Sequence, residues 1–112
     1  MIRILALHGQ PTDESSYTGH YIDVHMPIVQ RIPGLRNIRF GRVLETADGK
    51  PPPYYLVSDV YFDDMEALEK ALASPEMQEA FADVPNFATG GVTIMFCETT
   101  DIPPKPLADG ET

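Results

Sequence analysis

The stretch YYLVSDVYFDDMEAL, residues 54–68, joins the strongest strand signal in the chain to the start of a helix. Its first nine residues carry aromatic and β-branched side chains at both odd and even positions, which predicts a strand buried on both faces. Asp63 follows as a helix N-cap, with Glu66 three residues later to complete a capping box. The expected buried side of this helix consists of Met65, Leu68 and Leu72.

Further elements follow on both sides of this stretch. Upstream, residues 36–44 place apolar side chains at alternate positions, as a strand does, and the proline-rich segment 46–53 predicts a loop. Downstream, Ser74 and Pro75 predict the N-cap and first residue of a second short helix, and residues 92–97 predict a final strand. The expected buried positions of the second helix are Met77, Ala80 and Phe81.

The N-terminal part repeats the change from strand to helix. Residues 2–8 are rich in isoleucine and leucine and predict a strand. A helix is then expected from Asp13 as N-cap to the stop at Pro33-Gly34, because apolar residues recur three or four positions apart. This apolar stripe consists of Tyr17, Tyr21, Val24, Ile28 and Ile32. Pro27 lacks a backbone donor, so we expect a kink or break at Met26.

The resulting order β-α-β-β-α-β is typical of a ferredoxin-like α+β fold, with two helices on one face of a four-stranded antiparallel sheet. The other face would be open, yet the strands at residues 54–62 and 92–97 are apolar on both sides. Such a face is larger than the apolar patches that monomers usually expose. We therefore expect a second copy of the chain, a ligand or both to cover it.

Length and composition limit the chain to one small domain, assigned to residues 1–100, followed by a proline-rich acidic tail at residues 101–112. The formal net charge of -9 argues against nucleic acid binding, which requires clustered lysine and arginine. No apolar run suits a membrane span or a signal peptide and Cys97 is the only cysteine, so we expect a cytoplasmic protein. Scattered histidines predict no metal site, and no glycine-rich loop indicates a nucleotide or flavin cofactor.

Several short motifs occur together in order, namely IRILALHG (2–9), HYIDVHMPIVQRIPGL (20–35), VYFDDMEAL (60–68), SPEMQEAFADVPNF (74–87) and GGVTIMF (90–96). In this combination, which covers residues 1–99, the chain resembles the EthD family, named for ethyl tert-butyl ether degradation. The resemblance implies a dimeric α+β barrel, in which two ferredoxin-like units pair sheet against sheet and each encloses a pocket between sheet and helices. It also implies oxidoreductase activity, within a superfamily that includes cofactor-independent monooxygenases, polyketide cyclases, isomerases and dehydratases.

His25 matches the histidine of the H-x-P element in this resemblance. It lies four residues after Tyr21 and therefore borders the buried stripe. An imidazole with an ordinary pKa of about 6.5 accepts and returns a proton near neutral pH, so we hypothesise that His25 is a general acid or base. The alternative is a structural role, in which His25 caps the break before Pro27 or binds a backbone carbonyl.

Asp59 and Tyr61 are the other candidate catalytic residues. A carboxylate in an apolar strand requires a partner or a wet cavity, so Asp59 could orient His25 or bind a ligand hydroxyl. The alternative is a salt bridge from Asp59 to Arg39 or Arg42. Tyr61 could donate a hydrogen bond to an enolate or carbonyl oxygen, or serve only as a core or interface aromatic. The expected ligand contacts are Tyr21, Tyr55 and Phe40.

These features predict a homodimeric barrel that binds a small apolar or aromatic carbonyl compound and performs cofactor-independent oxidation or proton transfer at an enolisable carbon. In this mechanism His25 acts as base while Tyr61 or Asp59 fixes the oxygen. An accessory protein that binds a ligand for a partner oxygenase would need the pocket but no base, and a pure assembly module would need neither. A polyketide cyclase or dehydratase is a further alternative.

Overall fold

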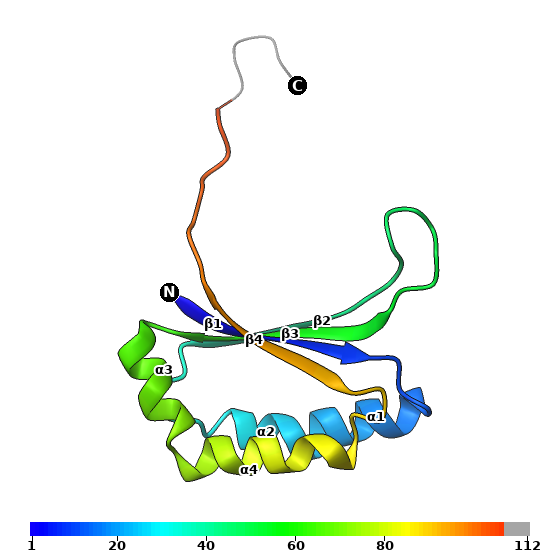
Figure 1. The fold of residues 1–112 in the computed structure, drawn as a ribbon, viewed down its shortest axis with the longest axis horizontal. Helices are drawn as coiled ribbons and strands as arrows, with labels where there is room; N and C mark the ends of the chain where they lie inside the picture. The colour runs from blue at the N-terminus through cyan, green and yellow to red at the C-terminus, as the bar shows by residue number, and fades with distance from the viewer. Residues whose placement is uncertain (107–112) are drawn as a thin grey trace.

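The computed structural model describes residues 1–106 and consists of a four-stranded sheet with helices on one face (Figure 1). The elements are β1 (Ile2–Gly9), α1 (Glu14–His20), the π-helical turn η1 (Tyr21–His25), α2 (Met26–Val29), β2 (Asn37–Arg42), β3 (Tyr54–Phe62), α3 (Met65–Leu72), α4 (Pro75–Asp83), the 3-10 turn η2 (Val84–Asn86) and β4 (Val92–Glu98). Neighbouring strands pair antiparallel in the order β2-β3-β1-β4. The predicted ferredoxin-like α+β fold is confirmed. Residues 107–112 of the expected tail lie outside the described residues.

The main core lies between the sheet and the helices. Successive side chains of a strand point to opposite faces, so alternate residues of β1 and β3 face the helices. Ile2 pairs across the strands with Phe62, and Ile4 pairs with Val60. Together with Leu68 of α3, these residues belong to one buried cluster in which Phe62 and Leu68 are completely buried. A second, largely aromatic cluster consists of Tyr17, Tyr21, Tyr55, Leu56 and Phe87.

The first helical segment differs from the prediction in its phase. α1, η1 and α2 follow one another without interruption, and the Met26 amide donates to the Tyr21 carbonyl, five residues back. This π-type hydrogen bond spans one residue more than an α-helical one, which rotates the side chains that follow. Val24, expected in the buried stripe, is therefore 43% exposed, and His25 is buried at 7%. The irregularity expected near Pro27 is a π turn directly before it, and the helix does not break.

The start of α3 also corrects the prediction. Asp64, not Asp63, is the N-cap, and its carboxylate accepts a hydrogen bond of 2.9 Å from the Ala67 amide. Asp63 instead binds the Arg36 guanidinium, with contacts of 2.8 and 3.0 Å. Met65 is the first residue of the helix and is exposed, so it does not belong to the buried side, whose buried residues are Leu68 and Ala71.

The start of α4 agrees with the prediction. The Ser74 hydroxyl caps the helix by accepting a hydrogen bond of 3.2 Å from the Met77 amide. Met77 and Ala80 are buried as expected, whereas Phe81 is exposed. No helix in the described part of the chain is long and apolar enough to span a membrane.

The face of the sheet opposite the helices, here called the open face, is not covered by any described element (Figure 1). By strand register, its apolar side chains are Leu5, Leu7, Val57, Tyr61 and Met95. One ion pair lies among them, with Arg3 Nη1 3.1 Å from Asp59 Oδ1. Asp59 pairs with Arg3, which lies diagonally across the β1–β3 pair, and not with the expected Arg42 or with Arg39, which stands directly opposite it on β2.

The edge strand β4 adds further exposed apolar surface. Ile94, Met95 and Phe96 are 37%, 41% and 51% exposed. By register Met95 lies on the open face, whereas Ile94 and Phe96 lie on the helix side, where the helices do not cover this edge of the sheet. The segment that follows β4 and the loop between β2 and β3 both extend to the side of the open face, away from the helices (Figure 1). The monomer therefore has one well-packed layer and one unpartnered apolar surface.

Candidate active site

A cavity of about 60 Å³ lies between the sheet and the helices. Its walls come from all the strands except β2 and from η1, α2 and α4, and they are mostly aliphatic. Four polar side chains line it, namely His8 from β1, Tyr21 and His25 from η1, and Ser58 from β3. Phe81 of α4 is the most exposed lining residue. No lysine, arginine, aspartate or glutamate of the described chain lines this cavity.

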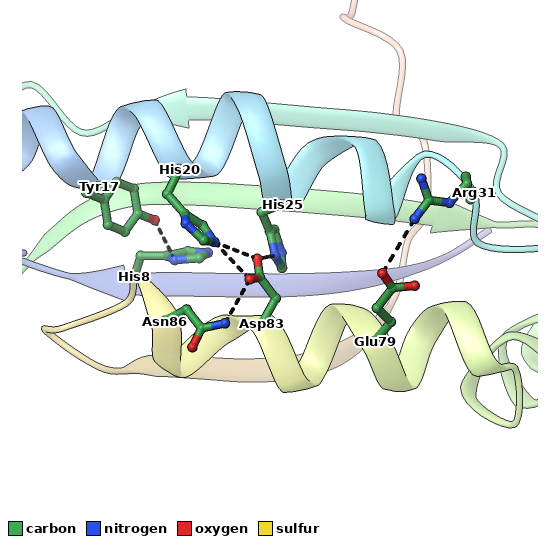
Figure 2. Close-up of polar contacts among 8 residues, drawn as sticks. All are labelled: His8, Tyr17, His20, His25, Arg31, Glu79, Asp83 and Asn86. Atoms are coloured by element: carbon green, nitrogen blue, oxygen red, sulfur yellow. Dashed lines mark hydrogen bonds and ion pairs between the residues drawn. The ribbon is translucent and has the colours of Figure 1, made fainter.

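The π turn places His25 against the end of α4 (Figure 2). His25 Nδ1 lies 2.9 Å from Asp83 Oδ2, and both side chains are buried. An ionised carboxylate only accepts hydrogen bonds, so Nδ1 carries the hydrogen of the neutral imidazole and Nε2 carries the lone pair. Within the described residues, the His25 side chain makes one hydrogen bond, from Nδ1 to Asp83. Its Nε2 is therefore available to a molecule in the cavity, which His25 lines.

Asp83 is the last residue of α4 and receives hydrogen bonds from three side chains (Figure 2). His20 Nε2 lies 2.8 and 3.0 Å from its two oxygens, and Asn86 Nδ2 donates at 3.1 Å. Burial raises the pKa of the Asp83 carboxyl, but the hydrogen bonds from Asn86, His20 and His25 outweigh burial and hold this pKa below its ordinary value. Asp83 is therefore ionised at neutral pH. No three histidine, cysteine, aspartate or glutamate side chains of the described chain are arranged to hold a metal ion.

The charge state of His25 follows from these surroundings. Burial lowers the pKa of His25, the Asp83 hydrogen bond and charge raise it, and the charge of His20 lowers it, with a net direction below the ordinary value. The imidazole is therefore mostly neutral at pH 7 and can accept a proton on Nε2. Once His25 is protonated, the Asp83 carboxylate is already placed to stabilise the imidazolium.

A second histidine, His8, reaches the same cavity from the end of β1. Its Nδ1 lies 2.6 Å from the Tyr17 hydroxyl, and both residues are buried (Figure 2). Burial, with a smaller contribution from the charge of His25, lowers the pKa of His8 to about 4. His8 is therefore neutral near pH 7 and adds a polar but uncharged group to the cavity wall.

The predicted ligand contacts are only partly at the cavity. Tyr21 lines it, whereas Phe40 and Tyr55 do not. The Phe40 ring packs edge-on against the Tyr21 ring at a centroid distance of 5.2 Å. The Tyr55 hydroxyl lies 3.1 Å from Thr18 Oγ1, and its ring packs against that of Tyr17. Phe40 thus packs against a residue that lines the cavity, whereas Tyr55 packs against Tyr17, which does not line it.

The predicted catalytic residues lie on opposite faces of the sheet. Ser58 of β3 is buried on the helix side, where His25 lies. Asp59 and Tyr61 stand at odd positions of the same strand and therefore point to the open face. Within one protomer, Asp59 does not orient His25, and Tyr61 does not share its cavity. The structure of one protomer therefore does not place either of the expected partners of His25, Asp59 or Tyr61, at its cavity, because the strand period separates them.

Asp83 and His8 are the site residues that the sequence analysis missed. Asp83 stands in a segment rich in acidic residues, a pattern typical of a solvated helix face, and it is 58 positions from His25. One signal was available, because Asp83 follows Ala80 by three residues and so extends the buried side of α4. His8 likewise continues the alternation that begins at Ile2 and Ile4 on the buried face of β1.

The segment that carries this site matches a known domain family, EthD, over residues 9–91. The uncharacterized 11.0 kDa protein in the thcB-thcC intergenic region of Rhodococcus erythropolis is 38% identical over 104 residues, which cover 93% of this chain and 100% of that protein. An EthD family protein from Bacillus halodurans is 32% identical, with a TM-score of 0.84 over 89% of this chain and 99% of that one. A dimeric ferredoxin-like protein of unknown function from Thermobifida fusca shares the fold, with 20% identity and a TM-score of 0.66 over 88% and 90% of the two chains.

Proposed function

Because the chain belongs to the EthD domain family, we propose that it is a proton-transfer enzyme that binds a small, largely apolar molecule in the cavity and uses His25 as its base. The observation that carries this proposal is the buried contact of 2.9 Å between His25 Nδ1 and Asp83 Oδ2 at the wall of an otherwise mostly apolar cavity. An oriented imidazole with a lowered pKa is the group that base catalysis near pH 7 requires.

The chemistry needs only the substrate and these side chains. His25 Nε2 takes a proton from an acidic carbon, the C–H bond breaks, and its electron pair moves into the neighbouring unsaturated group. Asp83 stabilises the imidazolium that forms, and the same imidazolium returns the proton to the same or a neighbouring carbon. A carbanion or enolate of this kind is also the species that a cofactor-independent oxidation would begin from.

We further propose that two copies pair through the open face to form a barrel. The apolar residues of that face, with the exposed Met95 of β4 among them, support a protein partner, because monomers rarely leave such a surface in water. The Thermobifida fusca protein with this fold is described as dimeric, which agrees with the proposal. Pairing through this face leaves the cavity, on the other side of the sheet, intact in each copy.

A second candidate function is ligand binding without catalysis, as an accessory protein to a partner oxygenase. The mostly aliphatic lining of the cavity favours it, since a binder needs apolar contact but no base. The two functions differ in their dependence on His25. A binder would retain its ligand and its role when the imidazole is replaced, whereas the enzyme would lose turnover.

Deuterium exchange into butan-2-one, followed by proton NMR in D₂O, tests the proposed function. We expect the protein to accelerate exchange at the carbons beside the carbonyl and His25→Gln to reduce the rate by about 100-fold or more, the usual loss when a general base is removed. His20→Gln is the matched control, because His20 binds the same carboxylate but does not line the cavity. We expect His20→Gln to reduce the exchange rate by less than about tenfold.

Two results would count against catalysis. Equal exchange rates for wild type and His25→Gln would show that His25 is not the base. Binding of butan-2-one with no acceleration of exchange over the buffer would favour the accessory binder.

A further inference from the structure

The Tyr21 hydroxyl is a polar group without a partner at the wall of the cavity. Tyr21 is 1% exposed, and its hydroxyl oxygen has no hydrogen-bond partner in the described part of the chain. Burial raises the pKa of Tyr21 to about 12, and a weaker hydrogen-bonding contribution from the Ser58 side chain lowers it, so the phenol keeps its hydrogen at neutral pH. Ser58 is thus near the hydroxyl but does not make a hydrogen bond of normal geometry with it. Buried hydroxyls are normally paired, which indicates that a ligand completes this one.

The hydroxyl and the proposed base belong to the same wall. Tyr21 and His25 are four residues apart on the helical segment, and their rings stack with centroids 5.7 Å apart and planes at 27°. Both residues line the cavity, together with Ser58 on the sheet side. A ligand that reaches both side chains would therefore meet a hydrogen-bond donor and a proton acceptor on one helical segment.

Charge and size restrict the part of the ligand that enters. No charged side chain of the described residues lines the cavity, so nothing there would compensate a carboxylate or phosphate for lost hydration. The volume of about 60 Å³ restricts the group that enters to a small one. The entering group is thus small and uncharged.

We propose that the Tyr21 hydroxyl is the oxygen-binding group of this site and that its ligand carries a small uncharged carbonyl, a ketone or aldehyde. The choice of a carbonyl over an ether or alcohol rests on the proposed function, since only a carbonyl makes the neighbouring C–H acidic enough for His25. In the reaction, the C–H proton moves to His25 Nε2, the electron pair moves onto the oxygen as an enolate, and the Tyr21 O–H donates to that oxygen.

Binding of two molecules of the same shape tests this assignment, namely butan-2-one and 2-methylbut-1-ene, in which a CH₂ group replaces the carbonyl oxygen. NMR titration of the labelled protein gives both values of Kd. We expect wild type to bind the ketone about tenfold more tightly than the alkene, as for one net hydrogen bond. Tyr21→Phe should abolish that preference by weakening the binding of the ketone and not that of the alkene. The carbonyl ¹³C shift of bound butan-2-one should move downfield with wild type and not with the variant.

Tyr17→Phe is the matched control, because it removes the buried hydroxyl that binds His8 but does not belong to the cavity wall. We expect it to keep the preference for the ketone. Pyruvate, which adds a carboxylate to the carbonyl, should bind at least tenfold more weakly than butan-2-one. Equal affinity of wild type for ketone and alkene, or an equal loss of both in Tyr21→Phe, would overturn the proposal. A ketone preference that depends on Tyr21, without deuterium exchange in wild type, would support the oxygen site and refute the proposed catalysis.

Discussion

On the covered face of the sheet, buried polar side chains converge on the Asp83 carboxylate and on the cavity beside it. On the open face, a single ion pair between Arg3 and Asp59 stands among apolar side chains. Among the buried side-chain oxygens and nitrogens of residues 1–106 that have no hydrogen-bond partner, the Tyr21 hydroxyl is the one on the covered face, and Tyr21 lines the cavity. The open face instead leaves apolar surface without a partner.

Strand β3 contributes side chains to both of these faces. From Leu56 to Phe62 its even positions build the core and the cavity and its odd positions build a surface for a second copy, whereas Tyr55, next to the shift in register, is buried in the aromatic cluster. Neighbouring residues of one strand therefore contribute to different properties, and substitutions one position apart should be distinguishable.

The largest effect should come from Phe62→Ala compared with Tyr61→Ala. Phe62 is completely buried on the covered face, so its truncation leaves a cavity and should reduce the free energy of unfolding by about 3–5 kcal/mol. Tyr61 is half-buried on the open face, so the same truncation should cost less than half as much. Urea denaturation at a fixed chain concentration measures both values, and equal losses would contradict the division between the two faces.

Acidification should act mainly through the covered face. The pKa of His8 is about 4 when folded and about 6.5 when unfolded, so below pH 6.5 the unfolded chain binds more protons. The contribution of neutral His8 to the free energy of unfolding is complete above pH 6.5. It is lost as the pH falls toward 4, and the total loss is about 3 kcal/mol. The lowered pKa of His25 acts in the same direction. Urea midpoints at pH 7, 5.5 and 4.5 should fall in wild type and fall less in His8→Gln, and a constant midpoint would refute this reasoning.

The smallest effect in free energy concerns the open face. Leu5→Asp places a charge at the centre of the proposed interface and should weaken dimerisation at least tenfold, or about 1.4 kcal/mol, with little change in the cavity. Ser15→Asp adds the same charge on an exposed position of α1 and should leave the dimer unchanged. Analytical ultracentrifugation measures both, and a wild-type chain that is monomeric at micromolar concentration would exclude pairing through this face.

Much of the fold could be predicted because its signals are local. Residues 54–62 form β3 with the predicted bounds, Ser74 caps α4, and the order of elements follows from the change between strand and helix periodicity. The errors also have local causes. The cap of α3 shifts by one residue because Asp63 binds Arg36, and Val24 leaves the core because the π turn rotates it outward.

The site could be predicted only in part. His25 matches the H-x-P element of the EthD resemblance and follows Tyr21 by one helical repeat, and the structure buries it at the cavity. Its carboxylate partner was sought at Asp59 on the most apolar strand, whereas Asp83 supplies it from the end of α4. No spacing within one element connects residues so far apart in the chain.

The sequence by itself determined where strands and helices form, that one strand has two apolar faces, and that His25 borders a buried stripe, because periodicity and capping act over a few residues. Only the tertiary structure decided which face of the sheet the helices cover, and therefore that Asp83, His8 and Tyr21 meet His25 while Asp59 and Tyr61 do not. The reason is that the alternation along a strand divides its side chains between two faces but does not show which face is covered. Packing against helices that are distant in the sequence decides that.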